Sequence, residues 1–558
     1  MLRRARAHRT LRRRAAGREA KGAGIRRRGL LGIACLGLAY ATVIQSFSWN
    51  QTSHYALIRS LAHGTARIDR YANETNDKAR YRRHWYSSRA PGLAILSVPA
   101  YGALTALHGP ALARDMQAQR NADEMVWALG LWAAVLPALV LLALVRAVAD
   151  RLEPGYGTAA AVTLGLGSLI LPLGTLLFSH VLAACLGFGA FALLQRERAG
   201  PGRTWWVAAA GGLVGYAMTT EYALLFVGVI LGLYALLRGP RVRRALAYAG
   251  GVVLGVVPLA LYDQAVYGSI THVAYADLPR HQSGFFGIRL PSLTVLVALL
   301  GDSRGLLTLA PVLVAGLIGI VLLYRRGHRA EAVVIAAVCA SYLLYNAGYF
   351  LPFGGGSPGP RFLVPTLPFL GVAFAAAYRR LPGPTLALGA VSATTLVTAT
   401  LTHPLVGYES ETGRWSRLLS QGFFQPTIVS AFGAGRGWVA IIPFLLLAGA
   451  AIVLAASVTD LQLSWAQMGW GAAAAAAWGL YAALGPPGLG IDHAAEARIV
   501  AAGDPTALIP RAGPHPLAHL VLLAVGAAAV ALALARVRFG WRARRPQRAR
   551  AALDATGS

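Results

Sequence analysis

Charged residues and cysteines are both scarce in this sequence. Only 13% of the 558 residues are charged, while 56% are hydrophobic; soluble domains usually carry about a quarter charged residues and fewer than half apolar ones. These proportions exclude a soluble multidomain enzyme and a disordered chain. Cys35, Cys185 and Cys339 lie inside apolar runs without the spacing of metal ligands, which excludes a disulfide framework and indicates small core side chains. We therefore expect an all-α, polytopic membrane protein.

Acidic residues are few compared with basic ones, at 22 against 52, so the net charge is +30. A charge of this size is typical of nucleic-acid-binding proteins, but its position in the chain indicates another partner. Residues 1–28 contain twelve Arg or Lys and one acid, and residues 536–558 contain seven Arg and one acid. Basic segments beside apolar spans mark the cytoplasmic side of a membrane and contact anionic headgroups. We expect membrane lipids as partners, no nucleic acid, and both termini in the cytoplasm.

Long apolar runs recur along the chain, and a helix needs about 20 apolar residues to cross a bilayer. The sequence predicts about fourteen such spans, near residues 29–48, 125–146, 157–177, 179–195, 204–219, 221–237, 244–262, 305–324, 331–350, 362–378, 384–402, 437–457, 464–484 and 516–535. Arginine clusters fall at alternate connections between them, at 146–151, 196–203, 238–244, 325–329 and 379–380. This alternation indicates a multi-pass protein of the cell membrane with an even number of crossings.

The same pattern divides the chain into four parts. We expect a basic cytoplasmic tail over 1–28, a transmembrane core over 29–402, a second transmembrane region over 403–538 and a basic tail over 539–558. The long loops all fall on the outer side, at 49–124, 263–304, 351–361, 403–436 and 485–515. Most acids and histidines outside the tails also fall there, so we expect any binding or chemistry on the extracytoplasmic face.

The first outer loop combines an apolar helix face with carboxylates. Residues 51–62 have a helical period that places Tyr55, Ile58 and Leu61 on one side, which predicts a short helix on the membrane surface. A second interfacial helix is expected over 92–108. Three carboxylates lie between these two helices, Asp69, Glu74 and Asp77. The alternative interpretation is a solvated loop whose charges pair with one another and with lipid phosphates.

Five short motifs follow the first span in a particular order. They are Tyr86-Ser87-Ser88-Arg89-Ala90-Pro91-Gly92, Phe178-Ser179-His180, Thr220-Glu221-Tyr222, Tyr267-Gly268-Ser269 and Gly354-Gly355-Gly356-Ser357-Pro358-Gly359-Pro360-Arg361-Phe362. With the large outer loop, the set resembles the GT-C superfamily of membrane glycosyltransferases over roughly residues 30–380. That superfamily includes the protein O-mannosyltransferases, the lipid A aminoarabinose transferase and the mycobacterial arabinosyltransferases.

The resemblance implies transfer of a sugar from a polyprenyl-phosphate donor to a lipid, glycan or protein acceptor on the outer face, with inversion. No nucleotide-binding motif is visible, which is compatible with a lipid-linked donor. Arg89 stands where the family places its phosphate-binding Lys, and Arg can bind a phosphate through two parallel hydrogen bonds. Arg59 and Arg361 are further candidates, although Arg361 could instead be an interfacial anchor. We expect no cofactor and no metal site, with a divalent cation as an open alternative.

The acceptor hydroxyl needs a general base, normally a carboxylate. Family members usually carry an Asp soon after the first span, but this chain has Asn50 and Gln51 there, and an amide does not accept a proton at neutral pH. Candidate bases are therefore Asp69 first, then Asp77, then Glu221. The missing acid leaves two other classes open, an inactive GT-C-like scaffold and a transporter or flippase of lipid-linked sugars.

Other side chains are expected to line the sugar site. They are Asn50, His54, Tyr55, Tyr86, His180 and Tyr222. Each has a plainer alternative, since His54 and Tyr55 would also suit packing of the surface helix and His180 would suit a helix cap.

Overall fold

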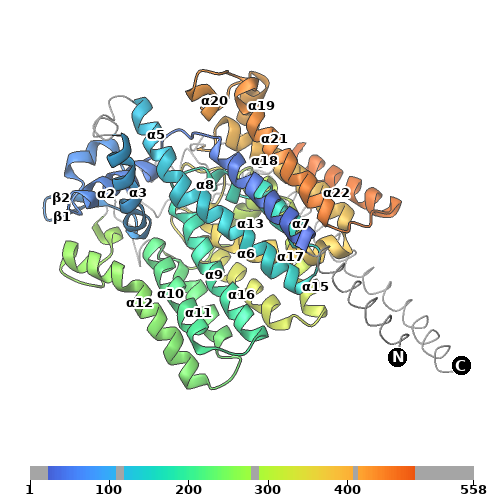
Figure 1. Ribbon diagram of the computed structural model, residues 1–558, viewed down its shortest axis with the longest axis horizontal. Helices are drawn as coiled ribbons and strands as arrows, with labels where there is room; N and C mark the ends of the chain where they lie inside the picture. Colours follow the sequence, from blue (N-terminus) through green and yellow to red (C-terminus); the bar gives the residue numbers. More distant parts are fainter. Residues whose placement is uncertain (1–22, 109–118, 278–287, 406–411, 484–558) are drawn as a thin grey trace, which may run out of the picture.

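The computed structural model describes residues 23–108, 119–277, 288–405 and 412–483. Within these ranges the chain is mostly helical, as the composition predicts (Figure 1). The expected outer loop 485–515, the expected span 516–535 and the basic tail 539–558 lie outside the described residues. Of the expected N-terminal tail, residues 23–28 are described, and they begin a helix that runs over residues 23–41.

One group of small elements packs together at one end of the molecule, and we call it the cap. It consists of α2 (Trp49–Ala62), η1 (Asp69–Glu74), β1 (Lys78–Tyr81), β2 (His84–Ser87) and η3 (Ala274–Asp277). The helix expected over 51–62 forms as α2, but it is buried from Asn50 to Ser60 because α3, η1 and β2 pack around it. The two strands were not predicted from the sequence. The helix expected over 92–108 is confirmed as α3 (Gly92–His108).

The remaining helices form a bundle beside the cap (Figure 1). They are α5 (Gln119–Gly130), the π-helical turn η2 (Leu131–Val135), α6 (Leu136–Leu152), α7 (Gly157–Leu166), α8 (Ile170–Gly174), α9 (Ser179–Ala199), α10 (Thr204–Thr220), α11 (Leu224–Ala235), α12 (Arg241–Tyr267), α13 (Leu293–Gly301), α14 (Leu306–Leu309), α15 (Val312–Arg325), α16 (Arg329–Ala347), η4 (Arg361–Thr366), α17 (Leu367–Arg380), α18 (Pro382–Thr402), α19 (Thr412–Ser420), α20 (Ile428–Ala431), α21 (Trp438–Val458) and α22 (Trp465–Ala483).

Among the described residues, seven helices are long and apolar enough to cross a membrane. They cover Glu124–Leu152, Ser179–Ala199, Arg241–Tyr267, Arg329–Ala347, Arg361–Arg380, Pro382–Thr402 and Trp438–Val458. An eighth is obtained if α13–α14 and α15, which meet at an angle of 94°, form one broken span. The span expected over 157–177 is interrupted, because α7 ends at Leu166 and α8 is a separate short helix. The total of about fourteen crossings stays a prediction.

Of the seven candidate spans, the two most deeply buried are those that contain α9 and α17. Their facing surfaces are joined by aromatic rings, with the centroid of Phe369 lying 5.2 Å from that of Phe188 and 5.3 Å from that of Phe191. Ring pairs at this separation stabilise packing beyond the area that they bury. Both helices therefore have fixed starting points, and those starting points, Ser179 and the η4 turn that precedes α17, face the cap.

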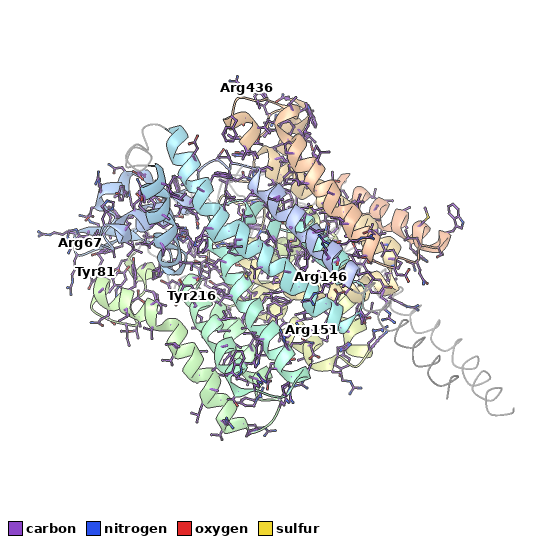
Figure 2. All side chains as sticks on the ribbon, viewed as in Figure 1. Arg67, Tyr81, Arg146, Arg151, Tyr216 and Arg436 are labelled. Carbon is purple, nitrogen blue, oxygen red and sulfur yellow. The ribbon has the colours of Figure 1, made fainter. Side chains whose placement is uncertain are left out.

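Basic residues gather at the opposite end of the bundle. Figure 2 shows Arg146 and Arg151 far from Arg67 and Tyr81, which lie on the cap. Two fully buried acids at this end pair with arginines: Glu197 binds both Nη atoms of Arg244 at 2.6 and 2.7 Å, and Glu153 pairs with Arg326 and Arg379. The arginine clusters thus lie on one side of the bundle, as the alternation in the sequence predicts.

Helices α10 and α12 approach so closely that glycines fill their interface. A Cβ atom on Gly251 of α12 would overlap the carbonyl oxygen of Ala208 in α10, and one on Gly215 of α10 would overlap the carbonyl oxygen of Val252 in α12. Small residues at such crossings let backbones pack in direct contact, which is a common way to hold helices together in a membrane. This contact positions the end of α12 that lies beside the cap.

We expect Gly251→Ala to lower the thermal unfolding temperature by several degrees, because its Cβ would push the two backbones apart at a cost of about 1–3 kcal/mol. Gly250→Ala is the matched control, since no atom lies within 4 Å of a Cβ placed there. Unfolding of the detergent-solubilised protein would be followed by fluorescence. Equal unfolding temperatures for the two variants would contradict the close contact.

Candidate functional site

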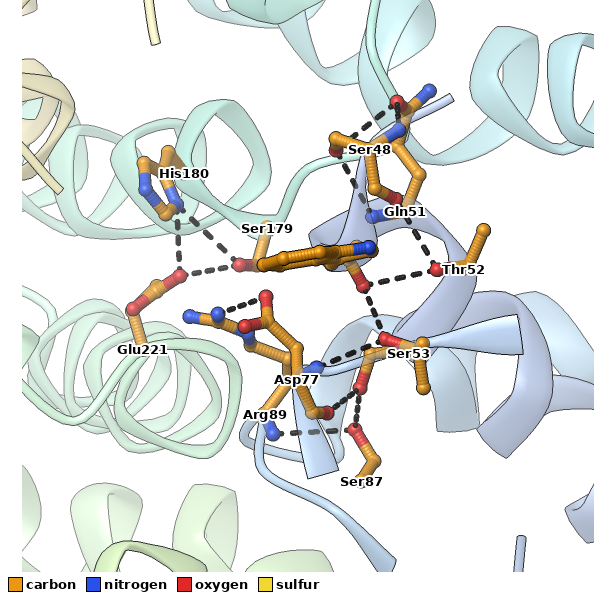
Figure 3. Close-up of polar contacts among 12 residues, drawn as sticks. Ser48, Gln51, Thr52, Ser53, Asp77, Ser87, Arg89, Ser179, His180 and Glu221 are labelled. Carbon is orange, nitrogen blue, oxygen red and sulfur yellow. Dashed lines mark hydrogen bonds and ion pairs between the residues drawn. The ribbon is translucent and has the colours of Figure 1, made fainter. Parts of the chain in front are cut away.

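The β1–β2 hairpin brings Asp77 and Arg89 together. Its register pairs Lys78 with Ser87, so the residues just beyond the strand ends are neighbours, and the N–H of Ser88 donates to the carbonyl oxygen of Asp77. Beyond this point an Nη of Arg89 forms an ion pair with the Asp77 carboxylate (Figure 3). The tight turn of the hairpin places Arg82 and Arg83 in the left-handed region, with φ of 43° and 72°, as two-residue hairpin turns require.

Helix α2 fixes the backbone of Asp77 from the other side. The Ser53 hydroxyl donates to the carbonyl oxygen of Asp77 at 2.6 Å and lies 2.8 Å from the Ser87 hydroxyl. The helix itself starts with a capping box, in which Ser48 and Gln51 satisfy each other's backbone N–H groups (Figure 3). Gln51, one of the two amide residues noted after the first span, therefore caps the start of α2.

One face of α2 presents unpartnered polar groups to these charges. Asn50 and His54, four residues apart on that face, are 2% and 0% exposed. None of their side-chain nitrogen or oxygen atoms has a hydrogen-bond partner within the described part of the chain. Burial, followed by the positive charge of Arg89, lowers the pKa of His54 to about 3. His54 is therefore a neutral imidazole that can both donate and accept a hydrogen bond.

Glu221 meets the start of α9. Because α11 begins only at Leu224, Glu221 lies in the connection between α10 and α11. The Ser179 hydroxyl donates to its Oε1, and Nδ1 of His180 lies 2.8 Å from the same atom (Figure 3). Burial by itself raises the pKa of Glu221, but His180, the Ser179 hydrogen bond and the charge of Arg89 together hold it below its usual value. Glu221 is thus an ionised carboxylate that is already engaged.

Arg361 contributes a buried positive charge at the start of η4. It is 5% exposed, and its guanidinium carbon lies 5.4 Å from the ring centroids of both Phe178 and Phe362. Its charge acts on Arg89, Asp77 and Glu221. Among the described residues it forms no ion pair, and its buried Nε has no hydrogen-bond partner. Gly354, with φ of 80°, leaves it room, because a Cβ there would lie 2.7 Å from that Nε.

Four charged groups are therefore close enough to act on one another, and their pairing is incomplete. The Asp77 carboxylate pairs with Arg89. The Glu221 carboxylate contacts Ser179 and His180. The buried Nε donors of Arg89 and Arg361 are left without hydrogen-bond partners in the described ranges. Buried donors without partners cost about 1–3 kcal/mol each, and more when charged, so the arrangement suits an anion with several acceptor oxygens. The described residues contain no group of three His, Cys, Asp or Glu suited to holding a metal ion.

Three of the residues predicted for the site lie elsewhere in the cap. Asp69, at the start of η1, accepts hydrogen bonds from the N–H of Trp85 and pairs with His84, both at 2.7 Å. Arg59 pairs with Glu74 and lies between the rings of Tyr55 and Tyr71, at 4.1 and 3.7 Å from their centroids. These contacts join α2 to η1 within the cap.

The other predicted residues do come together. Asp77, Arg89, Asn50 and His54 arrive from the cap, and His180, Glu221 and Arg361 arrive from three separate helix ends. Tyr222 and Tyr86 flank this group, with Tyr222 against Tyr275 at 5.6 Å and Tyr86 against Tyr267 at 5.9 Å between ring centroids.

Sequence reasoning missed Ser179 and Tyr275 as members of the site. Ser179 stood in the Phe-Ser-His motif but carries no charge that would single it out. Tyr275 lies in η3, where burial raises its pKa although Arg89 opposes this. No local pattern marks Tyr275, because it reaches the site through the packing of η3 on β1.

Comparison with known proteins finds similar structures but no similar sequence. No protein-family profile and no curated protein sequence matches this chain. The chain is similar to ArnT from Cupriavidus metallidurans in its apo state, with 15% identity, a TM-score of 0.46 and coverage of 82% of this chain and 76% of that one. For the same protein bound to undecaprenyl phosphate the values are 14%, 0.45, 76% and 74%.

A third similar structure is the Archaeoglobus fulgidus oligosaccharyltransferase in its apo form. The identity is 11% and the TM-score 0.40, over 78% of this chain and 57% of that one.

The low pKa of His54 predicts a dependence of stability on pH. Unfolding returns His54 to water, where its pKa is about 6.5, so below that value the unfolded chain binds a proton that the folded chain does not. Between about pH 6.5 and 4, His54 should therefore destabilise the fold by up to about 1.4 kcal/mol for each pH unit. His54→Gln should lose less thermal stability than the wild type over this range, and parallel curves would contradict a buried neutral imidazole.

Proposed function

We propose that this protein is a membrane transferase that moves a sugar from a polyprenyl-phosphate donor to a hydroxyl acceptor on the extracytoplasmic face. The observation that carries the proposal is Arg361, a buried guanidinium without an anionic partner among the described residues, close enough to Arg89 for the two charges to act on each other. A donor phosphate bound between Arg89 and Arg361 would supply the missing negative charge. Its oxygens would accept hydrogen bonds from the unpaired N–H groups of both guanidinium groups. A lipid-linked donor also fits a site built at the ends of apolar helices.

The same two arginines would act on the leaving group. In the proposed reaction the acceptor oxygen attacks the anomeric carbon, and the bond from that carbon to the phosphate oxygen breaks. The phosphate leaves with the electron pair, so its negative charge increases as the bond breaks. Fixed guanidinium groups in a site shielded from water stabilise such developing charge strongly. Direct attack from the opposite face inverts the anomeric centre.

We assign the role of general base to Asp77. In the absence of donor its carboxylate is paired with Arg89, and a phosphate that binds Arg89 competes for this guanidinium and leaves the carboxylate available to take the acceptor proton. Its backbone is held by Ser53, which keeps it beside the site. Glu221 already accepts from Ser179 and contacts His180, so we assign it the positioning of His180. Asp69 faces His84 and Trp85 instead.

Arg361→Gln should weaken binding of polyprenyl phosphate by about 10- to 100-fold, the effect of losing a hydrogen-bonded charge pair. Binding to the protein in lipid nanodiscs would be measured by native mass spectrometry. Arg67→Gln, which alters an exposed arginine of the cap, controls for the general loss of positive charge. If the two variants bind equally well, the phosphate site lies elsewhere.

Asp77→Asn should reduce the rate of sugar transfer by about 100-fold or more, because an amide takes no proton, while polyprenyl phosphate still binds. Asp69→Asn is the control and should retain most of the activity. Transfer would be measured from polyprenyl-phosphate hexose to a membrane lipid extract. Full transfer by Asp77→Asn contradicts the base assignment. Donor binding without transfer by the wild type favours a scaffold, and movement of the lipid across the bilayer without transfer favours a flippase.

A further inference from the structure

The outer end of α12 carries three buried polar atoms that the proposed mechanism does not use. They are the hydroxyls of Tyr262 and Tyr267 and the Oδ1 of Asp263, and none of them has a hydrogen-bond partner among the described residues. The side chains are 8%, 4% and 2% exposed, respectively. Leaving three such groups unpaired would cost several kcal/mol, at about 1–3 kcal/mol each. A cluster of this kind is expected where a ligand completes the hydrogen bonding.

The three groups form one cluster with neighbouring aromatic rings. The charge of Asp263 acts on Tyr262, on Tyr267 and on the half-buried Tyr222. The ring of Tyr267 also contacts that of Tyr86, with centroids 5.9 Å apart. The cluster is thus lined by tyrosine rings on two sides and has a carboxylate among them.

This cluster continues into the phosphate site. The ring of Tyr222 contacts that of Tyr275, with 5.6 Å between centroids. Tyr275 in turn lies close enough to Arg89 and Glu221 to interact with their charges. Tyr222 and Tyr275 are only half-buried, whereas the polar atoms behind them are enclosed. A group attached to, or approaching, a phosphate at Arg89 would reach Asp263 by passing these two rings.

We infer that Asp263, Tyr262 and Tyr267 form a sugar-binding subsite that holds the hydroxyl groups of a pyranose or furanose ring beside the phosphate site. This inference rests on the proposed function and names the part of the substrate that these residues recognise. Sugar hydroxyls donate to a carboxylate and both donate to and accept from tyrosine hydroxyls, so one ring satisfies all three groups. Tyrosine rings suit the apolar face of the same sugar.

An ammonium group fits this cluster less well. Aromatic rings around a carboxylate can hold a cation, but an ammonium only donates hydrogen bonds and would leave the two tyrosine O–H donors without acceptors. The chemistry that matches every unpartnered atom is therefore a neutral polyhydroxy ring.

The test compares three probes on the full-length protein in nanodiscs: polyprenyl phosphate, polyprenyl-phosphate hexose, and a methyl hexoside added with saturating polyprenyl phosphate. The variants are Tyr267→Phe, Tyr262→Phe and Asp263→Asn. The control is Tyr248→Phe on the same helix, whose hydroxyl donates to the Gly228 carbonyl oxygen at 2.8 Å. Each tyrosine variant removes one hydroxyl and keeps the ring, and a thermal unfolding temperature equal to that of the wild type would show that the fold is retained.

If the subsite holds the donor's sugar, the wild type binds the hexose-bearing lipid more tightly than polyprenyl phosphate, and each Tyr→Phe variant loses about 2- to 10-fold of that difference. If it holds a sugar of the acceptor, the variants instead lose stabilisation by the methyl hexoside. Either result supports the inference when Tyr248→Phe behaves as the wild type. Unchanged binding of all three probes in the variants overturns it and assigns the cluster to bound water. Absence of polyprenyl phosphate binding to the wild type overturns the proposed function as well.

Discussion

A guanidinium buried among aromatic rings requires a negative charge nearby, and this requirement governs the candidate site. Arg361 sits between Phe178 and Phe362, while both carboxylates within reach of its charge are engaged by other partners. Removing such a cation from water is costly unless it is compensated. The hairpin register and the starting points of α9 and η4 determine which charged groups lie close to Arg361. These groups are the ones that can offset its buried positive charge.

The bundle fixes the positions of the buried helix ends, and the cap carries the other charged and polar groups of the candidate site. Packing of Phe369 against Phe188 and Phe191 fixes α9 relative to α17, so His180 and Arg361 keep their spacing without a direct contact. The cap adds Asp77, Arg89, Asn50 and His54 from a segment held to the bundle by α2 and α3. In the proposed reaction, charged groups carried by a short hairpin and held beside buried helix ends would need little reorganisation when a substrate binds, which is the condition for strong electrostatic stabilisation.

Much of the site could be anticipated from the order of motifs along the chain. Arg89, His180, Glu221 and Arg361 all fall at helix ends that the arginine clusters assign to one side, and the structure brings them together. The choice between Asp69 and Asp77 could not be made in this way, because it depends on the register of a hairpin whose turn, Arg82-Arg83, lacks the Gly or Asn that usually marks one.

Two other features were hidden for related reasons. The apolar period of residues 51–62 predicts one buried face, but three neighbouring elements enclose α2 on the others, and such tertiary packing leaves no trace in local periodicity. Asp263 stands at the end of a long apolar run, and a single acid at that place predicts the start of a loop. Its relation to Tyr222 exists only after α10 and α12 have packed together.

Gly354 shows how the charge at Arg361 restricts a residue in another loop. Two independent conditions act on this position: a left-handed backbone, which most side chains avoid, and the space occupied by Nε of Arg361. Shortening the side chain at 361 would lift the second condition and leave the first. In related sequences, Asn at 354 should therefore appear together with a smaller residue at 361, since Asn tolerates the left-handed conformation but its Cβ does not fit beside the arginine. Covariation between positions 354 and 361 would thus show in which related sequences the buried arginine is retained.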